Sequence, residues 1–236
     1  MVTKLQLVVG GATVLVAFLL VAVVACDGGG GEADVTPTPG TTEVETQLRE
    51  MVLQLKDLPS GVILAEEFLV TAEESAAGSD DRAERLAKLN EWGYILGYEV
   101  TYQPNTAVMT QTGLMLANST SSLYDSEEGA EASFADAVET ARATDWAELW
   151  GGTQELKVEE LALPPVVDEG LWLRITAEAA PEVGIGEETF AQDVVLFRQG
   201  SGRGNLMVAW TMESGSSDFV LSLIQAQAQH LKETLP

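Results

Sequence analysis

Residues 190–212 read FAQDVVLFRQGSGRGNLMVAWTM. Two segments rich in β-branched and aromatic residues, Phe190–Arg198 and Leu206–Met212, flank the polar, glycine-rich segment Gln199–Asn205. This pattern predicts two antiparallel strands joined by a loop. A dinucleotide-binding glycine loop needs a following helix whose N-terminus meets the phosphate, and here a strand follows instead. The glycine-rich segment is therefore predicted to be a mobile hairpin loop.

Further strands are predicted before this hairpin. Residues 171–177 alternate apolar side chains with Trp, Arg and Thr, which predicts a half-buried strand. Residues 156–159 alternate in the same way, and residues 92–102 are aromatic and β-branched, as is typical of a strand. Residues 107–124 fit one long strand or a broken pair. The segment 62–70 fits either a strand or an irregular connection.

Helices are predicted around these strands from apolar residues spaced three and four positions apart. The predicted helices begin at Val44, at a cap on Ser79, at a cap on Asp125 paired with Glu128, and at a cap on Ser217 or Asp218. The last helix is expected to bury Val220, Ile224, Ala228, Leu231 and Leu235. This order of elements predicts an α+β fold in which helices cover an antiparallel β-sheet.

Three features of residues 56–236 resemble the PsbP-like sandwich found in some bacterial lipoproteins. They are the segment Leu58-Pro59-Ser60-Gly61, the Gly-Tyr strand near Tyr98, and the sequence VVLFRQG at residues 194–200 before a C-terminal helix. Members of that family mostly lack known catalytic residues and serve as accessory or interaction modules. The resemblance implies an α/β sandwich with a binding role.

The N-terminus has the order of an export signal. Lys4 is the only positive charge before the apolar run from Leu5 to Ala25. The run ends in Val23-Val24-Ala25-Cys26, which resembles the bacterial lipobox, with an aliphatic residue three positions before the cysteine and a small residue directly before it. In that family the thiol receives a diacylglyceryl group, and a peptidase cuts before the cysteine. The resemblance implies that Cys26 is a lipidated N-terminus and that residues 1–25 are a signal peptide.

An uncleaved membrane-spanning helix is the alternative, because the apolar run is long enough to cross a bilayer. Both interpretations place the rest of the chain outside the cytoplasm. Residues 26–43 are rich in Gly, Thr and Pro, which predicts a flexible linker after the lipidated cysteine. Residues 44–236 then form one extracytoplasmic domain, and the expected location is the outer side of the cell membrane.

Composition narrows the functional classes. The formal net charge of −25 argues against nucleic acid as a partner, because no basic stripe is present to neutralise phosphates. It favours cationic partners, and it is also common in proteins of saline habitats. The chain has 1 Cys and 1 His, which excludes an internal disulfide, a Cys-rich zinc site and a multi-histidine metal site. We therefore expect no cofactor and no metal.

Few residues stand out as candidates for function. Trp172 falls on the polar side of its strand, so an exposed indole there predicts a contact surface, and Arg203 in the glycine-rich loop is a second candidate. His230 is expected at the boundary of the last helix and not in a catalytic triad. Asn118-Ser119-Thr120 matches a glycosylation sequon, a pattern that arises often by chance.

Two functional hypotheses follow from these features. The first is a membrane-anchored extracytoplasmic lipoprotein that acts as a non-enzymatic binding or accessory module for a protein partner or a small ligand. The alternative is a secreted hydrolase that uses carboxylates on envelope polysaccharide. Two carboxyl groups about 5–10 Å apart, one of them buried with a raised pKa, would favour the enzyme. An apolar patch around Trp172 without such a pair would favour binding.

Overall fold

The computed structural model describes residues 7–9, 12–14, 41–150, 156–178 and 189–235. Its strands are β1 (Leu7–Val9), β2 (Ala12–Val14), β3 (Val62–Val70), β4 (Tyr94–Pro104), β5 (Leu114–Tyr124), β6 (Leu156–Leu161), β7 (Glu169–Glu178), β8 (Thr189–Gln199) and β9 (Gly202–Thr211). Its helices are α1 (Thr41–Met51), the short 3-10 helix η1 (Leu55–Asp57), α2 (Ala72–Ala76), α3 (Arg82–Glu91), α4 (Thr106–Thr112), α5 (Glu127–Ala143), α6 (Trp146–Leu149) and α7 (Ser217–Thr234).

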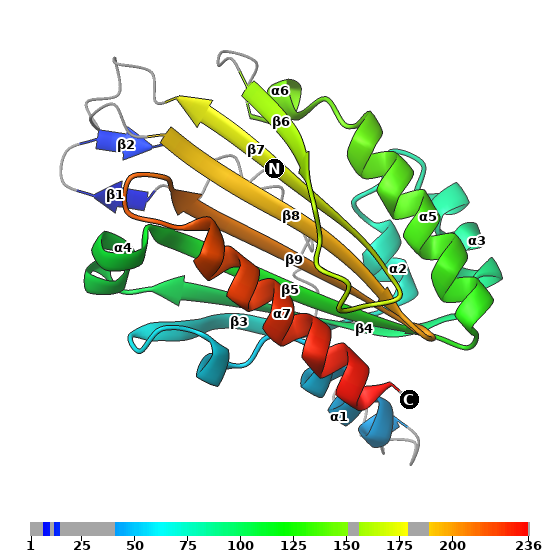
Figure 1. The fold of residues 1–236 in the computed structure, drawn as a ribbon. Helices are drawn as coiled ribbons and strands as arrows, with labels where there is room; N and C mark the ends of the chain where they lie inside the picture. Colours follow the sequence, from blue (N-terminus) through cyan, green and yellow to red (C-terminus); the bar gives the residue numbers. More distant parts are fainter. Residues whose placement is uncertain (1–6, 10–11, 15–40, 151–155, 179–188, 236) are drawn as a thin grey trace, which may run out of the picture.

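Seven strands form one antiparallel sheet in the order β3-β4-β5-β9-β8-β7-β6, with helices on both faces (Figure 1). The predicted α+β fold with an antiparallel, helix-covered sheet is thereby confirmed. Strands β1 and β2 pair antiparallel in a separate sheet of two strands. Strand β3, whose nature the sequence left open, is one edge of the large sheet, and β6 is the other.

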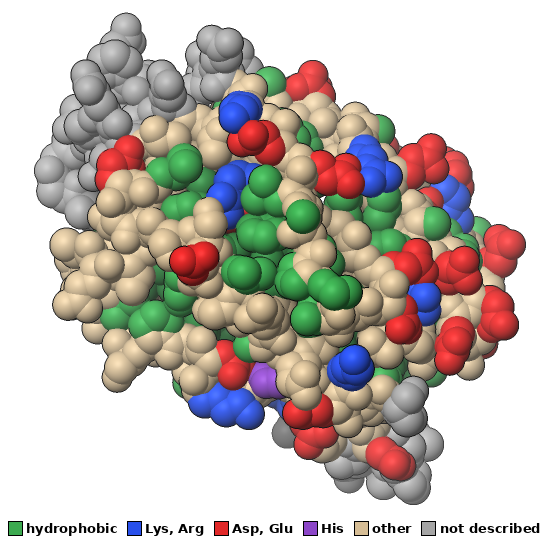
Figure 2. All heavy atoms as spheres, viewed as in Figure 1, with side chains coloured by type: hydrophobic (Ala, Val, Ile, Leu, Met, Phe, Trp, Pro, Cys, Tyr) green, Lys and Arg blue, Asp and Glu red, His purple; other side chains and the backbone are tan. Residues whose placement is uncertain are grey.

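Helices α7 and α1 cover one face of the sheet, called the α7 face below (Figure 1). The predicted apolar side of α7 is confirmed: Val220, Ile224, Ala228, Leu231 and Leu235 are all buried. Two glycines of β9 let this helix lie close to the strand, since a Cβ on Gly204 would stand 3.1 Å from Gln227 and 3.2 Å from Leu231. Figure 2 shows hydrophobic side chains gathered in the middle of this face and carboxylates mostly toward the side of α3 and α5.

Helix α5 lies on the opposite face, called the α5 face below. Its Phe134 and Ala141 join Leu171, Leu173, Ile175 and Leu196 in a second apolar cluster on β7 and β8. Ser133 of α5 also bonds to Tyr124 on β5 and Arg203 on β9, so the helix reaches these two strands as well. Helix α3 is tied to α5 by two ion pairs to Asp136, from Arg85 at 2.7 Å and from Lys88 at 3.2 Å.

The glycine-rich loop prediction is wrong in extent. Only Gly200 and Ser201 lie between β8 and β9, and the residues from Gly202 onward pair with β8 and β5. Gly200 has a φ of 52°, a conformation that favours glycine and allows a two-residue hairpin turn. The later glycines serve contact with α7 instead of loop mobility.

The segment 107–124 is neither one strand nor two. Helix α4 occupies its first part, capped by the Asn105 side chain, which accepts a hydrogen bond from the Val108 amide at 3.0 Å. Gly113 ends the helix with a φ of 69°, and β5 follows at once. For the three helices whose caps were predicted, the caps are Asp81, Ser126 and Ser216, each one or two positions from the predicted residue. Helix α1 ends at Met51, which leaves Leu55 exposed.

Candidate functional site

A buried ionic cluster joins β7, β8 and β9 on the α7 face. The Asp193 carboxylate is 0% exposed and accepts four hydrogen bonds. Two come from the Arg174 guanidinium, at 2.9 Å and 3.1 Å. The other two come from the indole N–H groups of Trp172 at 2.5 Å and Trp210 at 2.6 Å. A carboxylate with four donors and a paired cation satisfies the conditions under which a charge is tolerated in a core.

The Arg174 guanidinium is satisfied as well. It donates to the Ser217 hydroxyl at 2.7 Å, in the first turn of α7. Its central carbon lies 4.9 Å from the ring centroid of Trp210 and 5.4 Å from that of Trp172, within the range of cation–π attraction. Because each charged group has its partners inside the core, the cluster fixes the start of α7 against the sheet and is structural.

The predicted contact surface at Trp172 is therefore wrong, because its indole is only 5% exposed. Alternation along β7 does separate two faces, but both faces are covered. The α5 cluster covers Leu171 and Leu173, and apolar residues of the β6–β7 connection, including Leu163 and Val166, pack against the cluster that contains Trp172.

Arg203 and His230 are also held by contacts within the domain. Arg203 is half-buried in β9 and donates to the carbonyl oxygen and the hydroxyl of Ser133, at 3.2 Å and 2.8 Å. His230 lies at the boundary of α7, as expected, with Nδ1 2.7 Å from the Val52 carbonyl oxygen and Nε2 3.5 Å from the Asp57 carboxylate. Both side chains link elements of the fold and do not converge on a common site.

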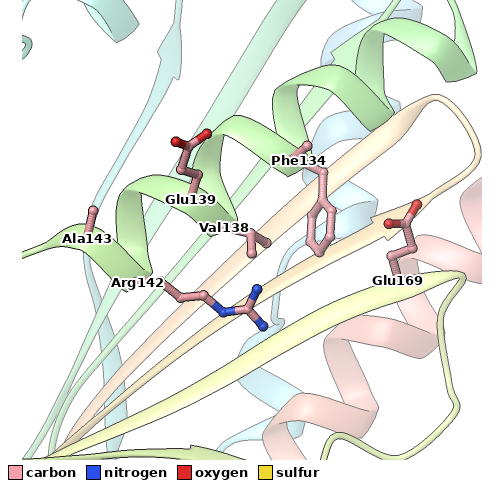
Figure 3. A pocket seen from close by; sticks show the side chains of 7 residues that line it. Phe134, Val138, Glu139, Arg142, Ala143 and Glu169 are labelled. Carbon is pink, nitrogen blue, oxygen red and sulfur yellow. The ribbon is translucent and has the colours of Figure 1, made fainter.

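A surface hollow of 640 Å³ lies between α5 and the start of β7. In Figure 3, Phe134 and Val138 project from α5, with Arg142 and Glu169 beside them. Two of the three charged residues here are paired with residues outside the hollow, since Arg142 makes two hydrogen bonds to Glu160 and Glu169 accepts one from Arg198 at 2.7 Å. Among the described lining residues only the Glu139 carboxylate has no hydrogen-bond or ion-pair partner, so the hollow shows no converging set of reactive groups.

The other half of the α5 face is polar. Cross-strand register places Glu99 opposite Thr120 and Thr101 opposite Asn118, and Thr120 opposite Asn205. Asn205 in turn pairs with Leu196, a member of the cluster beneath α5, so these five residues lie on the α5 face. We call Glu99, Thr101, Asn118, Thr120 and Asn205 the polar strip. Thr101 is buried and the other four are half-buried.

Hydrogen bonds organise the polar strip around Asn118. Its amide nitrogen donates to a Glu99 carboxylate oxygen at 2.8 Å and to the Thr101 hydroxyl at 3.0 Å. Both amide hydrogens are thereby used inside the strip. The amide oxygen of Asn205 is buried and has no hydrogen-bond partner within the described part of the chain. Buried polar atoms without a hydrogen-bond partner are uncommon in folded proteins.

Glu99 is electrostatically perturbed. Burial raises the pKa of its carboxyl group, the hydrogen bond from Asn118 opposes that rise, and the negative charge of Glu66 on β3 adds to it. Glu66 is exposed and pairs in register with Thr101, so the two carboxylates stand on the same face of adjacent strands. Half-buried carboxylates with raised pKa values gather at functional sites more often than elsewhere, which makes the polar strip our candidate site.

The sequence did not single out this strip. Glu99 is the only charged residue between Glu91 and Asp125, a signal that marks it within a strand of otherwise neutral residues. The run of polar residues 118–122 in β5 was considered only as a sequon. These two sequence features indicate a common site only once it is known that β4 and β5 are neighbouring strands of the sheet.

The lipobox residues Val23, Val24, Ala25 and Cys26 lie outside the described residues. Within the part that is described, no helix has the length and apolar character needed to span a membrane. Three or more His, Cys, Asp or Glu side chains placed to hold a metal ion are likewise not found in that part.

Comparison with known proteins identifies a structure with a similar fold but does not assign the chain to a family. No protein-family model matches the chain. No curated protein matches it either. Among solved structures, the chain is similar to the extracellular domain of PknH from Mycobacterium tuberculosis, with a TM-score of 0.51 and 10% sequence identity over 80% of this chain and 95% of that one. At this identity the similarity shows a shared fold alone.

The buried ion pair gives a stability prediction. Asp193→Asn leaves the guanidinium of Arg174 without a counter-charge and should lower the free energy of unfolding by about 3–5 kcal/mol. The double variant Arg174→Met with Asp193→Asn should lose less than the sum of the two single changes, because it removes both charges. Denaturant unfolding followed by tryptophan fluorescence measures each value.

The matched control is the exposed pair Lys157 and Glu159 on β6, whose charged atoms are 2.9 Å apart. Removing either charge there should change stability by less than about 1 kcal/mol. Equal losses at the exposed and the buried pair would contradict the structural role of Asp193.

Glu99 gives a pH prediction. A raised pKa in the folded state means that folding favours the protonated form, so this group lowers stability as pH rises from the unfolded pKa through the folded one. Glu99→Gln, which resembles the protonated form and keeps an oxygen for Asn118, should raise stability at pH 7 and leave it unchanged at pH 3. Thermal melts from pH 3 to pH 8 measure the difference, and a variant less stable at pH 7 would refute the assignment.

Proposed function

We propose that this chain is a lipid-anchored extracytoplasmic protein whose single domain binds a partner through the polar strip. The proposed anchor is Cys26, lipidated after export, and the proposed tether is residues 26–40, because residues 41–43 of the predicted linker belong to α1. The observation that carries the binding role is the half-buried row of polar side chains near the centre of the sheet, on the half of the α5 face beside the apolar cluster under α5. A polar surface at the centre of a seven-stranded sheet suits contact with water or with a ligand.

Two further observations support this proposal. The shared fold with the PknH domain is compatible with a location outside the cytoplasm, because that domain is extracellular. The hydrogen bonds within the strip are a second support, because Asn118 holds Glu99 and Thr101 in place. A binding surface whose side chains are already ordered loses less entropy when a ligand arrives.

A second candidate is the carboxylate-dependent hydrolase. The raised pKa of Glu99 and the proximity of Glu66 are the observation that favours it, because glycosidic hydrolysis uses two neighbouring carboxyl groups, one of which is protonated as the general acid. Against it stands the position of Glu66 on the edge strand β3, where it is exposed. We therefore rank binding first.

The anchor has a direct test. Cells that produce the wild-type chain and are fed radiolabelled palmitate should yield a labelled protein, whereas Cys26→Ser should carry no label. The label is expected because two acyl chains on one residue give stable membrane attachment. Unlabelled wild-type protein in the membrane fraction would leave the spanning-helix alternative in its place.

The binding surface has a separate test. Thr120→Trp places a large ring at the centre of the polar strip, and it should abolish recovery of the partner that the wild-type chain captures from detergent extracts. Thr140→Trp, on the exposed side of α5, is the matched control and should capture normally. Equal capture by both variants, with unchanged near-UV circular dichroism, would exclude the strip as the binding surface.

A further inference from the structure

The polar strip contains one carboxylate, Glu99, and adjoins a second, Glu66 on β3, with no described cation beside them. Two cross-strand rows on the α5 face contain the strip. One row is Phe68, Glu99, Thr120 and Asn205, and the other is Glu66, Thr101, Asn118 and Met207. None of these is Lys or Arg. Arg203, two positions before Asn205, is turned to Ser133 by two hydrogen bonds. The two negative charges are therefore left uncompensated among the described residues.

The hydrogen-bonding capacity of Glu99 is half used. One carboxylate oxygen accepts from Asn118, and the other oxygen has no partner within the described residues. The Glu66 carboxylate on the neighbouring strand β3 makes no hydrogen bond and no ion pair with the residues that the structure describes. These free oxygen lone pairs favour a ligand that donates hydrogen bonds, and the negative charge of the carboxylates favours a ligand that is positively charged.

The charges themselves indicate the sign of the ligand. Burial and Glu66 both raise the pKa of Glu99, so the ionised form of this carboxyl group is disfavoured in the folded protein. A bound cation reverses both effects, because it neutralises the repulsion and gives the buried charge a partner. A neutral ligand leaves the repulsion in place, and an anion increases it.

An aromatic ring completes the surroundings. Phe68 is the register partner of Glu99 on β3 and is half-buried on the same face. A ring beside a carboxylate is a frequent environment for an ammonium group, which is attracted to the face of the ring as well as to the anion. A hard divalent cation prefers about six to eight oxygen ligands, more than two carboxylates provide, and gains less from the ring.

We propose that the polar strip, with Glu66 and Phe68, binds a primary amine, whose ammonium group lies between the carboxylates of Glu99 and Glu66. The inference rests on the proposed binding function for its place on the α5 face and adds the chemical class of the ligand. The ammonium donates to the open oxygen of Glu99 and to Glu66, and its carbon chain lies against Phe68. The net charge of −25 increases the rate at which such a cation reaches the surface.

The test uses the full chain purified in detergent micelles and two small probes. The first is Nα-acetyl-lysine amide, which carries a free ammonium group, and the second is the same molecule acetylated on the side-chain nitrogen. Isothermal titration calorimetry at pH 7.5 should show binding of the first and not of the second. Binding should weaken as the pH falls and Glu99 takes up a proton, and in that pH range it should release protons when measured in buffers of different ionisation enthalpy.

Variants locate the site. Glu99→Gln should weaken amine binding by at least about tenfold, and Glu66→Gln, which removes an exposed and screened charge, by about threefold. Phe68→Leu should also weaken it by about threefold, through loss of the ring. Glu50→Gln, an exposed carboxylate on α1, is the matched control and should bind as the wild type does. Near-UV circular dichroism checks that each variant is folded.

The outcomes separate this inference from the proposed function. Equal binding of both probes, no binding of either, or an affinity unchanged in Glu99→Gln would overturn the amine assignment. Binding of calcium chloride or of N-acetylglucosamine at the strip, without the amine, would also overturn it. None of these results affects the palmitate label on Cys26 or the capture experiment with Thr120→Trp, which test the proposed function on their own.

Discussion

The packing of three strands and the last helix depends on the buried carboxylate of Asp193. This carboxylate lies at the centre of three neighbouring strands and receives two indoles and one guanidinium. Through Arg174 it reaches Ser217, at the point where α7 begins. Since a buried charge without partners costs several kcal/mol, the three strands and the helix must hold one geometry for the carboxylate to be tolerated.

The fixed position of Asp193 also determines which residues of β8 lie on the α5 face. Residues of β8 alternate between the two sides, so Asp193 on the α7 face places Val194 and Leu196 on the α5 face, beneath α5. The strands β4 and β5 continue the same sheet beyond this apolar cluster. Their side chains on the α5 face are polar and joined by the Asn118 hydrogen bonds. The face is therefore divided into an apolar half that packs and a polar half that is suited to contact.

The sequence predicted the elements whose burial has a simple period. The apolar residues of α7 recur at three and four positions, and the side chains of β7 alternate between apolar and polar, so both elements were recognised. Helix α4 was missed because it is short and rich in Thr and Val, residues that also favour strands. The exposure of Trp172 was misjudged because alternation shows two faces of a strand but does not show which of them a neighbouring segment covers.

The candidate site could not be predicted from the sequence, for a different reason. Glu99, Asn118 and Asn205 come from three strands, and their proximity depends on the order β4-β5-β9, which places the last strand of the chain next to the third strand of the large sheet in chain order. A long-range pairing of this kind leaves no local periodicity. What the sequence did supply was the isolated charge of Glu99, whose importance appeared only when its neighbours on both sides were known.

The same carboxylates bear on both functional hypotheses, and the two uses exclude each other. A general acid must stay protonated near neutral pH, which burial and the repulsion from Glu66 both promote. A bound ammonium group favours the ionised form of Glu99 and so removes the acid. The exposed position of Glu66 leaves room for a ligand above both groups, but it gives no enclosure that would exclude water from a reaction. Holding a cation requires no such enclosure, only charges in a fixed arrangement, and the carboxylates of Glu99 and Glu66 on adjacent strands fit that use better.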